Sequence, residues 1–527
     1  MLKLRIHLPT LPKVTLSHST LFQNLCRFVC CLCLPLGYLT AYGNVILFPE
    51  VKLERLVCQT LGVSRENLSK KLLQDELKSL DASSLEIRDL TGLEFATNLE
   101  ILVLRDNLID DLKPISNLAH LRKLDLSGNR IRNLSQLVPL SGSKMRKEVV
   151  DLQLSLEGRK TSRSKKTDIM QELSALVERL KMGPWALREI NLSNNRLLGL
   201  TGIEHFTDLV FLNVSKNALI DLEGLNQLKS LITLYAEQNQ LGRIETYVDE
   251  NKNKRYDFGE PVNDQSGNGK RDTDPLVEIQ SLPNLSNLYL HDNLIVSIDS
   301  IKDIPKLSVL FASNNKISDI STLSRFKNLT RLSLSDNKIC SLAGIGDLIN
   351  LKYLYLVENR ISDLRPLRGM SGLIELHLQR NQLFDVKPIE TLSNLEVLSL
   401  GYNLIYSSQF AQPLKKVRHL SIAHNCLSNN ESSHSKTLQI IKSRGGRLYT
   451  TSQRARIPEV ESLLGFLSGY PAANQKLGDY LSSHGYDNFM DYIEDLSISD
   501  DEKAASFLIW EQTLKKGLNL NDLAFIK

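Results

Sequence analysis

A motif of leucines ending in one asparagine, L-x-x-L-x-L-x-x-N, returns throughout the middle of this 527-residue chain. From Asn293 to Asn425 the final asparagines of successive copies stand 22 residues apart at every step. Earlier copies end at Asn107, Asn129 and Asn195. Regular periodicity over such a length is the signature of a repeat protein, in which every unit stacks on the next.

Each unit is predicted to form one short strand, then a turn, then a return along the opposite side. The two leucines of L-x-L point inward and the residue between them points outward, because side chains alternate along a strand. One unit cannot cover its own apolar face, whereas stacking buries that face between neighbours. The asparagine amide can pair turn groups that would otherwise be buried without partners, so we assign it a structural role.

These units resemble the internalin-type bacterial leucine-rich repeats, in part through segments after the asparagine such as Ile317–Ile320. The resemblance covers about residues 44–449. It implies an α/β repeat solenoid, a leucine-rich repeat horseshoe with a parallel β-sheet on its concave face. Residues 44–84 look like that family's helical N-terminal cap, with Gly62 ending the cap helix, and the repeats then occupy 85–449. Regulatory subunits of eukaryotic phosphatases share the 22-residue period, but their intracellular role fits poorly with an export signal.

The first 43 residues are predicted to be such an export signal. An uncharged apolar run, Phe28–Thr40, follows basic residues, and small side chains stand three and one positions before a cut at Asn44. The alternative is an uncleaved anchor over Phe28–Phe48, which is long enough to span a bilayer. Only that alternative would make the chain a membrane protein. We therefore expect a secreted, periplasmic or cell-surface protein.

Charge and motifs narrow the classes of function. Residues 1–43 carry four basic side chains and no acid, which accounts for the whole net charge of +4. The balanced remainder argues against a nucleic-acid partner. Cys58, Cys340 and Cys426 are too far apart in sequence for a disulfide framework or a metal pair. Because the sequence contains no nucleophile elbow, zinc-protease, phosphate-loop or dinucleotide motif, we expect a non-enzymatic protein.

Two insertions, 141–187 and 245–278, interrupt the repeats. The first is predicted to hold a degenerate repeat over 150–157, a basic loop and a helical segment from Ile169 to Leu180. We expect it to form a bulge on the convex side, with a basic patch for an acidic partner as the alternative.

The second insertion resembles a pair of EF-hand-type calcium loops. Calcium needs several oxygen ligands from one short segment, closed by a carboxylate. The first loop has Lys254 where glycine is usual, and the second has Pro275 in place of the closing carboxylate, so a disordered polar loop stays the alternative. The expected calcium ligands are Asp249, Asn251, Asn253, Asp257 and Glu260 in the first loop and Asp264, Ser266, Asn268 and Asp272 in the second.

The chain beyond the repeats is predicted to contain a closing strand at Arg447–Thr451 and then short helices over 457–527. Solenoids need a cover for their open end, so these helices are expected to form a C-terminal cap. A small separate binding module is the alternative.

Alternation along the strands predicts which side chains stand on the concave face. We call each stacked repeat unit a rung of the solenoid. The position between the two inward residues is small or polar in the first rungs and becomes aromatic in later ones. Exposed aromatic side chains make rigid anchors for a partner, although they can also stack on one another across strands. We predict a protein partner here, with a carbohydrate-binding or wall-associated structural protein as the alternative because aromatic rings also stack on sugars. The expected binding residues are Tyr235, Tyr289, Phe311, Tyr353, Tyr355 and His377.

Overall fold

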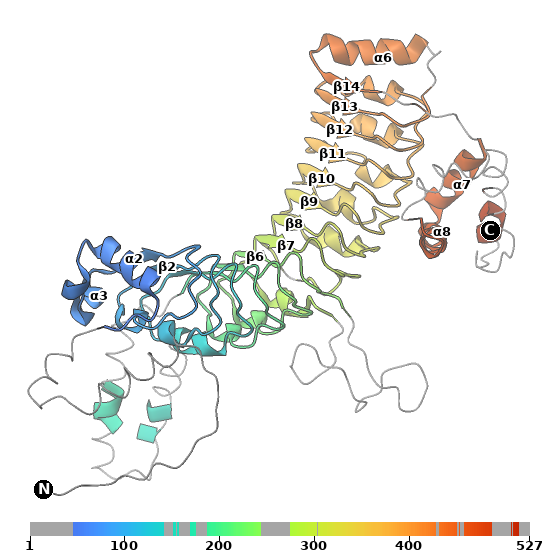
Figure 1. The fold of residues 1–527 in the computed structure, drawn as a ribbon. Coiled ribbons are helices and arrows are strands. Elements are labelled where there is room, and N and C mark those ends of the chain that lie inside the picture. Colours follow the sequence, from blue (N-terminus) through green and yellow to red (C-terminus); the bar gives the residue numbers. More distant parts are fainter. Residues whose placement is uncertain are drawn as a thin grey trace, which may run out of the picture.

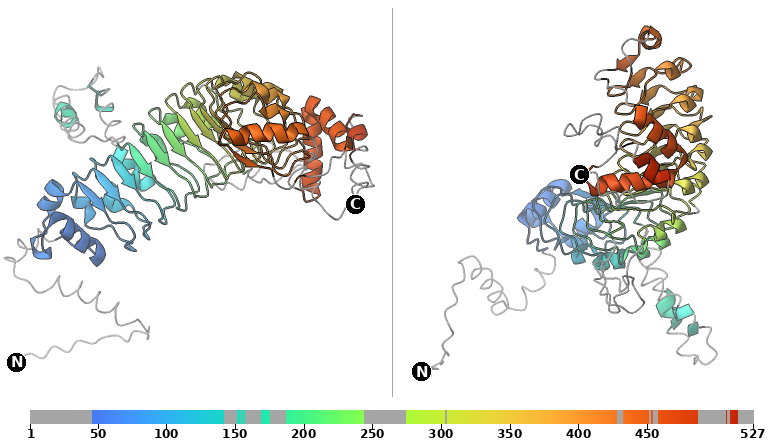
Figure 2. Two further views of the ribbon diagram at one scale, coloured as in Figure 1. Left: turned by 90° about the horizontal axis from the view of Figure 1, so that it is seen from above. Right: turned by 90° about the vertical axis from the view of Figure 1, so that its right-hand side faces the viewer.

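The computed structural model contains one long parallel sheet whose strands follow each other in sequence order, so it confirms the predicted solenoid (Figure 1). The structure describes residues 46–141, 187–243, 274–302, 304–427, 432–450, 453 and 458–486, together with parts of 151–174 and of 507–515. Fourteen strands lie within these residues. The strands line the inner side of the curved molecule, and this inner side is its concave face (Figure 2).

Each strand is three residues long and pairs in register with the next, as Leu288 does with Leu310. The strands are β1 Ser79–Asp81, β2 Ile101–Val103, β3 Lys123–Asp125, β4 Glu189–Asn191, β5 Phe211–Asn213, β6 Thr233–Tyr235, β7 Asn287–Tyr289, β8 Val309–Phe311, β9 Arg331–Ser333, β10 Tyr353–Tyr355, β11 Glu375–His377, β12 Val397–Ser399, β13 His419–Ser421 and β14 Arg447–Tyr449. Most units also contain a short 3₁₀ helix, and another such helix, Arg65–Asn67, precedes the first strand. The 3₁₀ helices of the units are Leu93–Phe95, Lys113–Ile115, Ser135–Ser141, Ile203–His205, Leu225–Gln227, Val277–Ser281, Ser321–Arg325, Ile345–Asp347, Arg365–Leu367, Lys387–Thr391 and Gln409–Ala411.

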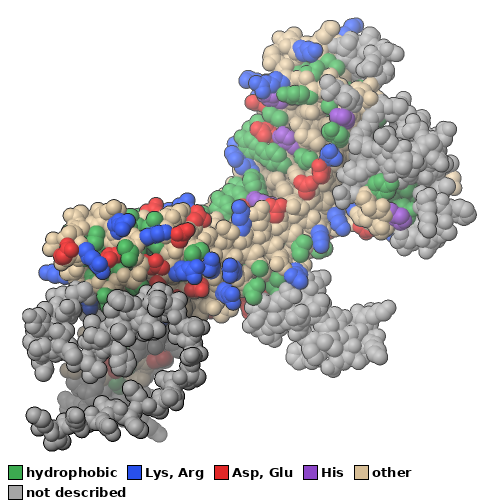
Figure 3. Space-filling view, in the orientation of Figure 1, with side chains coloured by type: hydrophobic (Ala, Val, Ile, Leu, Met, Phe, Trp, Pro, Cys, Tyr) green, Lys and Arg blue, Asp and Glu red, His purple; other side chains and the backbone are tan. Residues whose placement is uncertain are grey.

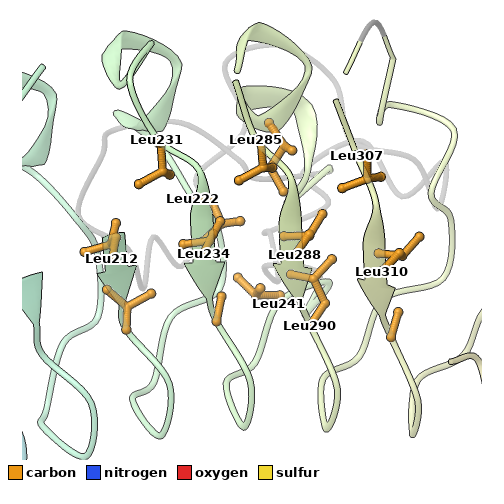
Figure 4. Packing of buried hydrophobic residues seen from close by; sticks show 14 of the residues in the cluster. Leu212, Leu222, Leu231, Leu234, Leu241, Leu285, Leu288, Leu290, Leu307 and Leu310 are labelled. Atoms are coloured by element: carbon orange, nitrogen blue, oxygen red, sulfur yellow. The ribbon is translucent and has the colours of Figure 1, made fainter. Parts of the chain in front are cut away.

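The core is a continuous stack of leucines and isoleucines between the sheet and the convex side. In the units of β1–β13 both inward residues of the L-x-L position are buried, as Leu288 and Leu290 are in the seventh strand and the turn after it. Leu285 and Leu307 pack against them from the segments before the strands (Figure 4). Each such side chain contributes about 1.5–3 kcal/mol when fully buried, so several in every unit offset the cost of ordering the chain.

The repeated asparagines form a hydrogen-bonded ladder at the end of each strand, which confirms their structural role. Asn337 is typical: its Oδ1 accepts from the backbone N–H of Ile317 at 2.9 Å, one rung before it. Its Nδ2 donates to the carbonyl oxygens of Ala312 and Leu334, each at 3.0 Å. The residue before each ladder asparagine has positive φ, as Asp336 does at 52°, so the asparagine stabilises a turn that most side chains disfavour.

Two helices precede the sheet, α2 Val51–Leu61 and α3 Lys70–Glu76, and their apolar residues join the same core. Gly62 ends α2 in the left-handed conformation at φ 65°, as the sequence predicted. Phe48 is buried beside Gly92, where an added Cβ would lie 2.6 Å from its ring. This close approach explains the glycine in that turn.

The first insertion differs from its prediction. Strand β3 pairs directly with β4, and Ile131 N–H donates to Asn195 Oδ1 at 3.0 Å, so no rung lies between them. Residues 151–153 and 155–156 are helical. The prediction of a degenerate repeat over 150–157 is therefore wrong. The segment lacks the ladder asparagine, and without it the turn after a strand has no internal partner. Helix is also present at 169–174, within the expected helical segment.

Beyond β13 the chain forms α6 Ser432–Ser443 and then β14, which confirms the closing strand (Figure 1). Helix α6 lies against β14 at this end of the solenoid. Helices α7 Pro458–Gly469 and α8 Pro471–Ser483 lie elsewhere, beside the last rungs rather than across the end, so they do not occupy the place of the expected cap.

Helices α7 and α8 pack on the flank of the solenoid, at the residues that follow the ladder asparagines. Leu463 and Leu477 join Leu404 and Cys426 of the repeats in one apolar cluster. Nearby, Arg360 is only 2% exposed and its Nη2 donates to the carbonyl oxygen of Gly478 at 3.0 Å. None of the helices in the described part of the chain is long and apolar enough to cross a membrane.

Candidate binding surface on the concave sheet

The predicted binding residues lie on neighbouring strands of the concave sheet and fall into two groups. Tyr235, Tyr289 and Phe311 occupy the same position on β6, β7 and β8, where each faces the next across the parallel pairing. Phe211 on β5 adjoins them, and we call these four residues the first cluster. Tyr353, Tyr355 and His377 lie on β10 and β11 and form the second cluster. Ser333 of β9 separates the two.

The first cluster is held together by ring contacts between rungs. The rings of Tyr235 and Tyr289 are stacked, with centroids 4.2 Å apart and planes 4° from parallel. The Phe311 ring meets Tyr289 edge to face at 5.3 Å, and the Phe211 ring lies 5.6 Å from that of Tyr235. Phe211 was not among the predicted residues, although it stands two residues before the middle position, as the predicted Tyr353 does on its own strand. All four side chains are half-buried.

The second cluster combines a ring stack with polar contacts. Tyr355 and His377 have ring centroids 4.8 Å apart, and the Tyr355 hydroxyl donates to Glu375 Oε2 at 2.9 Å. That carboxylate oxygen also lies 3.6 Å from His377 Nε2. The guanidinium of Arg331 lies over the Tyr353 ring, 4.7 Å from its centroid. Glu375 and Arg331, which the sequence analysis did not single out, therefore position the predicted residues.

Burial sets the protonation of these groups. It raises the pKa of Tyr289 and of Tyr355 to about 12, so both hydroxyls stay neutral donors near pH 7. Burial lowers the pKa of His377, and the nearby Glu375 opposes that shift only in part. The imidazole is therefore mostly neutral near pH 7, and the cationic group beside the second cluster is the Arg331 guanidinium.

An acid–imidazole pair borders the first cluster. Glu237 Oε2 lies 3.5 Å from His291 Nε2. Burial raises the pKa of the Glu237 carboxyl, and the charge of His291 opposes the increase. These two residues follow Tyr235 and Tyr289 along the chain, so the aromatic surface has a polar margin on the side of the asparagine turns.

The first rungs of the same sheet have a different surface. Lys123 Nζ lies 2.9 Å from Glu189 Oε2, and Arg105 Nε lies 3.4 Å from Asp125 Oδ2. The concave side accordingly carries mixed charges over the early rungs, and apolar and histidine side chains gather over the later ones (Figure 3). The half-buried aromatic side chains of the strands themselves thus lie on β5–β8 and β10–β11.

The predicted calcium ligands, from Asp249 to Asp272, all lie outside the described residues. Strand β6 pairs directly with β7, so the insertion that carries these ligands leaves the sheet between Tyr235 and Tyr289 and returns to it without breaking the register. Within the described residues, no group of three or more histidine, cysteine or acidic side chains is placed to hold a metal ion.

Comparison with known proteins agrees with this architecture. The family model for Leucine Rich repeats (2 copies) matches residues 97–139, 283–325, 305–348 and 327–369. An internalin from Listeria monocytogenes, InlF, superposes with a TM-score of 0.52 over 78% of this chain and 92% of its own, at 18% identity. The solenoid is built of leucine-rich repeats and has the internalin fold.

Two further solved structures are similar over comparable lengths. A leucine-rich repeat protein of Leptospira interrogans is 21% identical, with 76% of this chain and 96% of that one covered and a TM-score of 0.47. The functional domain of InlJ from Listeria monocytogenes is 17% identical, with 75% and 78% covered and a TM-score of 0.46. No curated protein matches the chain by sequence.

Proposed function

We propose that this chain is a non-enzymatic binding protein of the bacterial envelope or exterior, and that it recognises a protein partner through the two clusters on its concave sheet. The observation that carries the proposal is the confinement of half-buried aromatic rings to β5–β8 and β10–β11, on a sheet whose early rungs carry ion pairs. Rigid aromatic side chains are the usual anchors of protein interfaces.

The ring geometry favours a protein partner over a sugar. The stacked faces of Tyr235 and Tyr289 already cover each other at 4.2 Å, so a sugar ring cannot stack between them. Rings that pack on one another, with a hydroxyl group on each tyrosine, suit irregular side-chain packing with hydrogen bonds, which is the chemistry of a protein interface.

The proposal is tested by capture and titration. The wild-type protein and the Tyr289→Ala and Tyr355→Ala variants are immobilised, proteins captured from host or neighbouring-cell extracts are identified, and the purified partner is titrated against each variant. Truncating a central anchor should cost about 2 kcal/mol, or about thirty-fold in affinity. The Tyr289→Phe variant keeps the ring stack but lacks the hydroxyl, so it distinguishes the contribution of the hydroxyl to binding from that of the ring.

Tyr449→Ala is the matched control. Tyr449 occupies the same position on β14, opposite Ser421, and is 55% exposed outside both clusters. Its truncation removes the same side chain and should leave binding unchanged. A partner that binds the control variant and the two cluster variants equally well would place the interface elsewhere. Binding of neutral glycans that is lost in Tyr289→Ala would favour the carbohydrate alternative.

A further inference from the structure

Basic side chains gather where the last two strands begin. Exposed cations come from the segment before β13, from the end of α6 and from the start of β14. Backbone pairing brings these segments together, because Arg447 N–H donates to the Arg418 carbonyl oxygen at 2.6 Å. The six side chains are Lys415, Lys416, Arg418, Lys442, Arg444 and Arg447.

A pocket of about 460 Å³ opens among them. Its lining holds four cations and one acid, so it has a net charge of plus three. Two of the cations are held in place by hydrogen bonds: Arg444 Nη1 donates to the Leu414 carbonyl oxygen at 3.2 Å, and Lys416 Nζ donates to Asn394 Oδ1 at 2.6 Å. The lining residues are Glu396, Lys415, Lys416, Val417, Arg418 and Arg444, and we call this site the basic pocket.

Within the described part of the chain, the basic pocket gathers its cations without acids that pair with them. Some cations on other rungs are neutralised by an acid on a neighbouring rung, as Lys123 is by Glu189 at 2.9 Å and Lys327 is by Asp347 at 3.7 Å. None of the six cations at the last rungs forms a salt bridge with a described carboxylate. Like charges this close repel one another, so the free energy of the cluster falls when an anion enters.

We propose that the basic pocket binds the phosphate or sulfate groups of an anionic polysaccharide. Guanidinium groups bind such oxyanions through paired N–H donors, and the lysines add point charges. The pocket lining has no aromatic residue on which a nucleic-acid base could stack. Its only apolar residue, Val417, is 1% exposed, so the site lacks the apolar surface that inserts into a membrane. This site is independent of the two clusters on the concave sheet.

The test is a calorimetric titration of the full chain with two probes, a heparin-derived octasaccharide and a glycerol-phosphate polymer. The test variant is Lys415→Gln with Arg418→Gln, since neither side chain makes a hydrogen bond within the described residues. The matched control is Arg122→Gln with Lys123→Gln, which removes the same charge where each cation has an acid partner. Thermal unfolding of both variants checks that the fold is intact.

We expect the test variant to bind at least ten-fold more weakly than wild type and to lower the slope of log affinity against log salt by about two, one for each lost contact. The control should change affinity less than two-fold. The tighter of the two probes identifies whether sulfate or phosphate is the preferred group. Equal losses in both variants, no binding of either probe at physiological salt, or equally tight binding of a single-stranded oligonucleotide would each overturn the proposal.

Discussion

The ladder asparagines offer the sharpest test of what holds the solenoid together, and Asn337→Ala is the informative substitution. Asn337 is 8% exposed and makes four hydrogen bonds, one accepted by Oδ1 and three donated by Nδ2. Alanine removes all four without adding bulk. The cost depends on which of the four partners are left without any other hydrogen bond.

Three of the partners keep a second donor. Asn315 Nδ2 also donates to the Ala312 carbonyl oxygen at 3.1 Å, and Asn359 Nδ2 also donates to that of Leu334 at 2.9 Å. The Ser335 carbonyl oxygen accepts from a backbone N–H of the previous rung. Only the buried N–H of Ile317 loses its sole partner within the described residues. An unpaired buried N–H costs about 1–3 kcal/mol, so we expect a loss near 2 kcal/mol.

The assay is urea unfolding combined with hydrogen exchange at the Ile317 amide. Asn328→Ala is the control, because Asn328 is exposed and makes a single bond, at 2.7 Å, to the Pro305 carbonyl oxygen. The control should change stability by less than about 0.5 kcal/mol. The Ile317 amide should exchange faster only in Asn337→Ala. Equal stability of the two variants, or an unchanged exchange rate at Ile317, would refute the reasoning.

Three further predictions concern the ends and the insertions. Mass spectrometry of the exported protein should find an amino terminus near Asn44, whereas an uncut leader would favour the membrane anchor. Calorimetry should show weak calcium binding, at about 10⁻⁴–10⁻³ M, that the paired changes Asp249→Ala and Glu260→Ala abolish; equal heats for wild type and variant would leave only a polar loop. Gly478→Ala would place a Cβ 2.1 Å from the buried Arg360 guanidinium, so α8 should separate from the flank at a cost of about 1–3 kcal/mol. Unchanged hydrogen-exchange protection in α8 would contradict this last prediction.

The repeats could be predicted from sequence because one local rule determines both structure and exposure. The 22-residue period specifies which leucines face inward, and alternation then places Tyr289 and Tyr355 on the concave sheet. The contacts of those side chains depend on their rotamers and on the residues of neighbouring rungs. The alternation of side chains along a strand predicts neither of these. The hydrogen bond from Tyr355 to Glu375 and the place of Phe211 beside Tyr235 therefore emerged only from the structure.

The position of the C-terminal helices could not be predicted from the sequence, for a different reason. The sequence of helices α7 and α8 contains no repeated motif. Their apolar residues indicate that the helices pack against another part of the protein, but they do not indicate which part. A candidate signal lies in the solenoid, at the position after the ladder asparagine. This position is mixed on earlier rungs, where it holds Leu108 and Leu294 as well as Arg130, and it is apolar on two consecutive rungs at the end, at Leu404 and Cys426. Helices α7 and α8 cover both of these residues, but a position that is also apolar on earlier rungs could not have predicted this from sequence alone.

The spacing of the two clusters constrains the proposed partner. Phe311 and Tyr355 lie on strands two steps apart, so about 10 Å of sheet separates them. Ser333 lies on the strand between them, and its Oγ lies 2.7 Å from that of Ser313, so small polar side chains occupy the gap between the two clusters. A partner that contacts both clusters must bridge this gap with a bulky side chain or leave the serines hydrated. The proposed interface is thus two separate anchor points, and truncations at Tyr289 and at Tyr355 should add nearly independently.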